Sequence, residues 1–231
     1  MSDDLYMGFI WPSAHSFNKQ GEIDKIIGNY VEVISKKEIQ LYSFQALKNF
    51  IYQIYYKEPW IGSFSTHFCG VNGKAGFCYD ELLILTAYVF KASDLKIVNF
   101  MKDVIRNYCK MEKHSFHTTD NTLEFTYAYN LCMNDNSILL INTTQLFLFE
   151  DFSTQFQEYF ADVLMSKIND ESKIVINDVQ KWQNEQLLFL EWNKNLDDIF
   201  TNEEYYGWYM GVKIISKRGL TVLMDKMEQL Y

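Results

Sequence analysis

The residue types best able to do chemistry are concentrated between Glu112 and Asn121, in the run Glu-Lys-His-Ser-Phe-His-Thr-Thr-Asp-Asn. This run holds two of the four histidines of the chain. Histidine exchanges a proton near neutral pH, and together with hydroxyls and helix N–H groups it can bind an anion. We predict candidate catalytic roles for His114, His117 and Asp120, and candidate contacts to an anionic ligand for Thr118 and Thr119.

The same run also has a purely structural interpretation. Thr119 or Asp120 would then be the N-cap of a helix that continues to about Met133, and the two histidines would bind backbone carbonyls. If residues 115–118 are extended, alternation along a strand places His114 and His117 on opposite faces, with Thr119 on the face of His117. Both interpretations stay open from the sequence.

A glycine-rich segment, Cys69–Cys78, offers a second place for an anion. Gly73 and Lys74 resemble the end of a phosphate-binding loop, but the Walker A pattern fails at Phe68 and Ala75. We keep Lys74 as a candidate phosphate contact and expect Gly62–Gly76 to be a loop. The spacing of the cysteines matches no zinc site, so no metal site is predicted.

Carboxylate pairs that would hold a divalent ion are missing from the sequence pattern. Metal-dependent phosphoryl transfer uses acidic residues that converge on a cation, and no Asp-x-Asp occurs in the chain. The cofactor is therefore unknown at this stage, with Mg²⁺ as a candidate.

Charge and hydropathy restrict the partners. The chain has 231 residues, with 21 basic and 30 acidic side chains and a net charge of −9, which argues against sequence-independent nucleic-acid binding. The first residues, Met-Ser-Asp-Asp-Leu, lack the cationic start of a signal peptide. The longest apolar stretch, Leu82–Phe90, is about half of a membrane span. We expect a cytoplasmic protein that binds a small anion and no nucleic acid.

Hydrophobic periodicity predicts alternating strands and helices. The expected strands are Leu5–Trp11, Tyr30–Ser35, Leu82–Phe90, Ser137–Asn142 and the aromatic stretch Tyr205–Ser216. The expected helices are Gly21–Asn29, Ser43–Tyr56, Ser93–Cys109, Asp120–Met133, Phe152–Ile168 and Asp178–Leu196. This alternation favours an α/β fold with a mixed or mostly parallel sheet flanked by helices. A change of composition near Thr143–Asp151 predicts two domains, an α/β domain at 1–145 with the histidine run and a smaller α+β region at 146–231.

Several patches resemble a bacterial family. The run Lys113–Asp120, then Glu124 and Asn134-Asp-Asn-Ser-Ile, is similar to a block in proteins from surface-polysaccharide loci. Such proteins open with a strand like Gly8–Pro12 and end in a nucleotidyltransferase-like module with an aromatic Gly-x-Lys segment, which Tyr205–Ser216 matches. The resemblance implies a nucleotide or sugar phosphate as ligand, with Lys213 as a candidate phosphate contact. The family's Gly-Ser and Asp-x-Asp are missing between Asn142 and Tyr205.

Three functions follow as hypotheses. The first is a transferase-like protein of capsule or lipopolysaccharide biosynthesis that binds a nucleotide-activated or phosphorylated sugar. The second is a non-catalytic binding or scaffolding module of the same fold. The third is a protein-interaction factor that uses exposed aromatic side chains as anchors.

Overall fold

The computed structural model describes residues 4–55, 58–61 and 70–143, and three short strands between residues 187 and 215. The chain divides into two compact units, Met1–Met133 and Asn134–Tyr231. The division falls ahead of the composition change near Thr143–Asp151. No helix among the described residues is long and apolar enough to cross a membrane.

The first unit is built around one four-stranded sheet. Its strands are β1 (Asp4–Ile10), β2 (Glu32–Gln40), β3 (Ile84–Ala92) and β4 (Phe116–Thr118), in the spatial order β2-β3-β1-β4. Its helices are α1 (Pro12–His15), α2 (Glu22–Tyr30), α3 (Phe44–Tyr55), α4 (Gly70–Cys78), α5 (Leu95–Cys109) and α6 (Thr122–Met133). Short 3-10 turns are η1 (Ser16–Asn18), η2 (Pro59–Ile61) and η3 (Glu112–His114).

The α/β class is confirmed, but the strand directions of this sheet differ from the expected mixed or mostly parallel arrangement. All three neighbouring pairs, β1 with β3, β1 with β4 and β2 with β3, are antiparallel. The order is that of a split β-α-β arrangement, with additional helices α3 and α4 between β2 and β3. Strands that alternate with helices along the chain do not reveal whether another strand lies between them in the sheet, so the sequence pattern could not separate the two cases.

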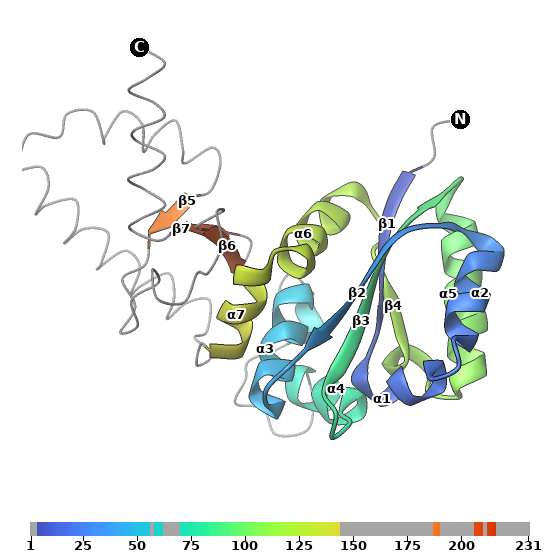
Figure 1. Ribbon diagram of the computed structural model, residues 1–231, viewed down its shortest axis with the longest axis horizontal. Coiled ribbons are helices and arrows are strands. Elements are labelled where there is room, and N and C mark those ends of the chain that lie inside the picture. The colour runs from blue at the N-terminus through green and yellow to red at the C-terminus, as the bar shows by residue number, and fades with distance from the viewer. Residues whose placement is uncertain are drawn as a thin grey trace, which may run out of the picture. The chain divides into compact units, whose positions relative to one another are not determined.

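Strand β1 lies in the middle of the sheet and is covered on both faces. Residues Tyr6 and Ile10 belong to a buried cluster with Phe116 of β4 and apolar side chains of α2 and α5. Figure 1 shows α2 and α5 side by side on this face. On the other face, the ring of Phe9 contacts that of Phe50 in α3, with ring centroids 6.0 Å apart. Every described β1 side chain from Tyr6 onward is therefore buried or glycine, as a continuous apolar strand predicts.

Two helix boundaries show which side chains cap the helices. The N-cap of α5 is Asp94, whose side chain accepts a hydrogen bond from the backbone N–H of Ile97. At the start of α6, Asn121 Oδ1 accepts from the N–H of Glu124 at 3.0 Å. Asn121 therefore occupies the capping role that the sequence assigned to Asp120 or Thr119.

The second unit is described by a helix and a small sheet. Helix α7 (Asp135–Thr143) is followed by β5 (Leu187–Phe189), β6 (Tyr206–Tyr209) and β7 (Val212–Ile215), in the order β5-β7-β6. Strands β5 and β7 are parallel, and β6 and β7 are antiparallel. Strands β6 and β7 confirm the extended structure predicted for Tyr205–Ser216.

Two predicted elements of the second unit are wrong. The expected strand Ser137–Asn142 is part of α7, because Asn134 Oδ1 accepts a hydrogen bond from the N–H of Ser137 at 2.9 Å and starts a helix there. Periodicity alone does not separate a short apolar strand from a buried helix. The predicted helix Asp178–Leu196 contains strand β5. The predicted helix Phe152–Ile168 lies outside the described residues.

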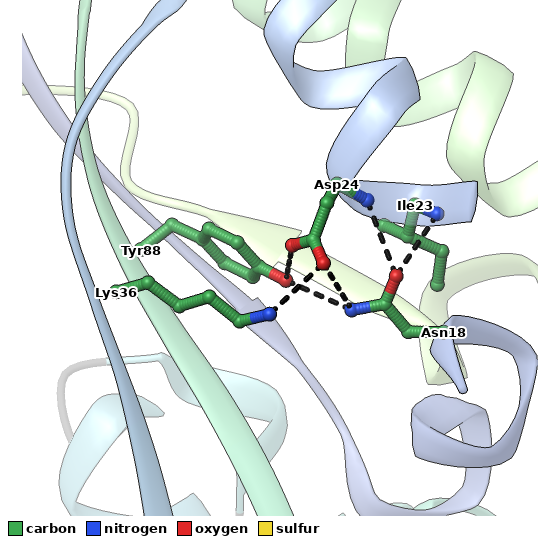
Figure 2. A network of polar contacts seen from close by, with 5 residues as sticks. All are labelled: Asn18, Ile23, Asp24, Lys36 and Tyr88. Carbon is green, nitrogen blue, oxygen red and sulfur yellow. Dashed lines mark hydrogen bonds and ion pairs between the residues drawn. The ribbon is translucent and has the colours of Figure 1, made fainter. Parts of the chain in front are cut away.

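A polar network fixes the start of α2 against the sheet (Figure 2). Asn18 Oδ1 accepts hydrogen bonds from the N–H groups of Ile23 and Asp24, and so caps the helix. The Tyr88 hydroxyl of β3 donates to Asp24 Oδ1 at 2.7 Å, and Lys36 Nζ of β2 lies 2.9 Å from Asp24 Oδ2. Burial raises the pKa of Asp24, but these donors and the Lys36 charge outweigh it and leave the pKa lowered from 3.8.

The network predicts that Tyr88→Phe destabilises the protein. The substitution keeps the buried ring and removes the hydroxyl that donates to the Asp24 carboxylate, which should lower the free energy of unfolding by about 1–2 kcal/mol. Urea denaturation measures this change. Tyr108→Phe is the control, because the Tyr108 hydroxyl makes no hydrogen bond to a described residue, and it should change stability by less than about 0.5 kcal/mol. Equal effects of the two substitutions would contradict the role of the network.

Candidate functional site

A cavity of about 400 Å³ opens in the first unit, on the sheet face that α3 covers. Residues of six elements meet at its wall, from α3, η2, α4, α5, η3 and β4. The described lining residues are Tyr55, Trp60, Gly70, Gly73, Lys74, Phe77, Arg106, Lys113, His114 and His117. Cationic, aromatic and imidazole side chains therefore face one volume.

The backbone from Lys113 to Phe116 carries both histidines, and each of its four carbonyls accepts a hydrogen bond from outside the segment. Lys74 Nζ donates to the Lys113 carbonyl, and Ser13 Oγ donates to that of His114 at 3.1 Å. The N–H of Trp11 donates to the Ser115 carbonyl at 3.1 Å, and Arg106 Nε donates to that of Phe116 at 3.1 Å. Two cations of the cavity wall thus also fix the segment that positions the histidines.

The turn that leads into this segment has an unusual backbone. Lys110 and Glu112 adopt positive φ angles of 54° and 47°, although neither is glycine. Such residues are uncommon and carry a conformational cost that the surrounding contacts must offset. The four carbonyl hydrogen bonds of residues 113–116 provide such contacts.

Three cations share the wall without a neutralising carboxylate. No acidic side chain of the described residues forms an ion pair with Lys74, Arg106 or Lys113, and none of the described lining residues is acidic. Lys74 is 6% exposed, and its Nζ lies 5.2 Å from the centroid of the Trp11 ring. Burial, with the charges of Arg106 and Lys113, lowers its pKa to about 8 although the nearby Cys78 thiol opposes the change. The cations are therefore held close together at an electrostatic cost.

The two histidines are neutral at pH 7. The ring of His117 stacks on that of Phe9 with centroids 5.9 Å apart and meets the Tyr55 ring at 4.8 Å. Burial lowers the pKa of His117 well below 6.5, and the nearby cations act in the same direction. Burial lowers the pKa of His114 to about 4, and the charges of Lys74, Lys113 and Arg106 act in the same direction. Neutral imidazoles can donate or accept hydrogen bonds inside the cavity without adding charge.

Three of the predicted site residues come together. Lys74, His114 and His117 all line the cavity, so the two histidines share it despite the opposite faces expected for an extended segment. The expectation fails because His114 belongs to η3 and only His117 belongs to β4. Lys74 also lies on a helix, α4, where a loop was predicted for Gly62–Gly76, of which residues 62–69 are outside the described structure.

Three other predicted residues, Thr118, Thr119 and Asp120, are not among the described lining residues. Thr118 is buried and its hydroxyl has no hydrogen-bond partner among the described residues, while Thr119 Oγ1 accepts from the N–H of Met7 at 3.0 Å. Asp120 is exposed and lies 3.5 Å from Lys102 Nζ, so its catalytic assignment finds no support in this geometry. Lys213 pairs in register with Leu187 in the second unit.

Sequence reasoning missed Arg106, Lys113 and the aromatic wall. Arg106 lies in an ordinary amphipathic helix, and only the antiparallel pairing of β4 with β1 brings the helix beside the histidines. A signal was available for Lys113, which precedes His114 directly. Among the described residues, no three His, Cys, Asp or Glu side chains gather as metal ligands would. A divalent ion such as Mg²⁺ would find no carboxylate on the described wall.

Comparisons with known proteins give no family. No family model and no curated protein matches the chain. Among solved structures, the chain is similar to a nucleoside diphosphate kinase of Aquifex aeolicus, with 13% sequence identity and a TM-score of 0.37. The match covers 55% of this chain and 93% of the kinase. A TM-score of this size supports no conclusion about function, so the function must be argued from the cavity itself.

Substitutions of two glycines in α4, Gly70 and Gly76, should have opposite effects on the stability of the protein. Gly70 has a φ of +61°, and a Cβ there would lie 2.1 Å from the carbonyl oxygen of Ile61. We expect Gly70→Ala to lower the free energy of unfolding by about 2 kcal/mol or more. A Cβ at Gly76, six residues further along α4, would meet no described atom within 4 Å, so Gly76→Ala should stabilise the helix by about 0.5–1 kcal/mol. Denaturant unfolding of both variants measures the contrast, and a stabilising Gly70→Ala would contradict this position of α4.

The half-buried His117, whose ring contacts those of Phe9 and Tyr55, predicts acid sensitivity. Because its folded pKa is depressed, the unfolded chain binds a proton below pH 6.5 that the folded chain does not, and stability must fall as the pH falls. For one such proton, the free energy of unfolding should decrease by about 1.4 kcal/mol for each unit by which the pH falls below 6.5. Urea denaturation between pH 7 and pH 5 should show a smaller slope for His117→Gln. Thr118→Val, a neighbour that does not titrate, should keep the wild-type slope. An unchanged slope in His117→Gln would show that His117 is protonated in the folded state.

Proposed function

We propose that the first unit binds a small phosphorylated ligand in this cavity. The observation that carries the proposal is the cluster of Lys74, Arg106 and Lys113 without a carboxylate partner among the described residues. In a chain of net charge −9, three cations around one cavity favour an anionic ligand over a neutral or cationic one. The ligand would supply the counter-charge that the described wall lacks.

The free donors of the wall suit a phosphate. Arg106 uses its Nε–H for the Phe116 carbonyl, so the four N–H bonds of its terminal nitrogens are not used by the described residues. Guanidinium groups bind phosphate oxygens with two parallel hydrogen bonds. Gly70, the first residue of α4, adds a backbone N–H group that has no partner within the helix.

Two features of the described wall favour different functions, turnover of the ligand and binding without turnover. Two imidazoles beside the phosphate contacts support a transferase-like protein, in which His117 or His114 would move a proton during transfer from a nucleotide-activated or phosphorylated sugar. Their lowered pKa values make both of them weak bases in the ligand-free protein. The lack of a carboxylate on the described wall supports the alternative, a binding module without metal-dependent turnover. A role in surface-polysaccharide biosynthesis remains a prediction of the sequence resemblance.

Binding of inorganic pyrophosphate and ribose 5-phosphate, measured by isothermal titration calorimetry, tests the proposal. Lys113 is exposed and its ammonium makes no structural contact with described residues, so Lys113→Gln should fold normally and weaken binding about tenfold. Lys96→Gln removes the same charge from an exposed position of α5 outside the cavity and should change affinity by less than about twofold.

The pH dependence gives an independent check. Lys74 loses its proton as the pH rises through about 8, so affinity for a phosphorylated ligand should decrease between pH 7 and pH 9. No binding of either compound, or equal losses in Lys113→Gln and Lys96→Gln, would contradict the proposal.

A further inference from the structure

Two large aromatic side chains at the cavity are exposed. Trp60 of η2 is 46% exposed and Phe77 of α4 is 65% exposed, and both line the cavity. Exposure of such apolar ring surface to water is energetically unfavourable in the ligand-free protein. When they gather at a concave site, they commonly mark a contact to a ligand or a partner.

Each of these rings also packs on another residue that lines the cavity. The Phe77 ring stacks on the imidazole of His114, with centroids 4.5 Å apart and an angle of 28° between the planes. The Trp60 ring packs on Tyr55 at a centroid distance of 4.9 Å. One face of the Phe77 ring is thus used for stacking, while the Trp60 ring meets Tyr55 at an angle of 59° between the planes. The large exposed fractions leave apolar ring surface for a ligand.

The two exposed aromatic rings and the three cations line the same cavity. His114 contacts Phe77 by stacking and lies in η3 next to Lys113, while Tyr55 contacts Trp60 and lies 5.8 Å from Lys74 Nζ, measured from the centroid of its ring. A ligand whose anionic group meets the cations therefore places its remaining atoms against aromatic surface. A cavity of about 400 Å³ lies within the usual range of small-molecule sites.

We propose that the phosphorylated ligand is a nucleotide, whose base stacks on Phe77 or Trp60 while its phosphates bind Lys74, Arg106 and Lys113. This inference rests on the proposed function and selects a nucleotide over a simple sugar phosphate. Aromatic side chains stack on every base, because each base has a π-face. Stacking on Phe77 or Trp60 therefore suits purine and pyrimidine bases alike.

Calorimetry with ADP, UDP and inorganic pyrophosphate tests this inference. Both nucleotides should bind about tenfold or more tightly than pyrophosphate, since stacking adds a favourable contact that pyrophosphate cannot make. Phe77→Leu and Trp60→Leu should together remove most of that advantage and leave the pyrophosphate affinity within about twofold of wild type. Phe100→Leu, a change of a 58% exposed ring on α5 outside the cavity, should affect neither ligand.

The outcomes separate this inference from the proposed function. Pyrophosphate that binds as tightly as ADP and UDP would overturn the stacking site and leave the phosphate site intact. Equal losses of ADP and pyrophosphate affinity in the double variant would overturn it as well. Failure of all three compounds to bind would overturn both proposals.

Discussion

The site depends on the four consecutive carbonyls of Lys113, His114, Ser115 and Phe116. Their hydrogen-bond donors come from three separate parts of the chain: Trp11 and Ser13 after β1, Lys74 in α4 and Arg106 in α5. Because backbone acceptors must be satisfied when buried, these donors fix one conformation of the segment. The positions of both histidines, and the positive φ angles of the preceding turn, follow from that constraint.

The same hydrogen bonds bring positive charge to the cavity. Lys74 and Arg106 are structural donors, and each keeps further N–H groups after its carbonyl bond is made. Loss of solvent around these groups lowers the pKa values of Lys74, His114 and His117, and repulsion from the neighbouring cations lowers them further. A cavity of this kind is poised for an anion, because anion binding relieves the repulsion that folding creates.

Part of this arrangement was predictable from the sequence. The β1 strand, the amphipathic helices α3 and α5, and the choice of Lys74, His114 and His117 followed from hydrophobic pattern and residue chemistry. The antiparallel sheet did not, because pairing partners are set by tertiary contacts and not by local pattern. Helix α7 was missed because its apolar run resembles a strand, and α4 because its glycines resemble a loop. Arg106 has no local signal, since its role depends on where β4 pairs.

The central claim, that the cationic cavity takes up a phosphate, is tested most directly by the Arg106 side chain itself. The chain contains two arginines, Arg106 and Arg218, so an Arg106→Lys variant assigns the Arg106 Nε–H signal in a ¹H–¹⁵N NMR spectrum. Titration of the wild-type protein with pyrophosphate should shift this signal in a saturable manner, together with the ring signals of His114 and His117. Unchanged signals of all three side chains at a large excess of pyrophosphate would contradict the claim.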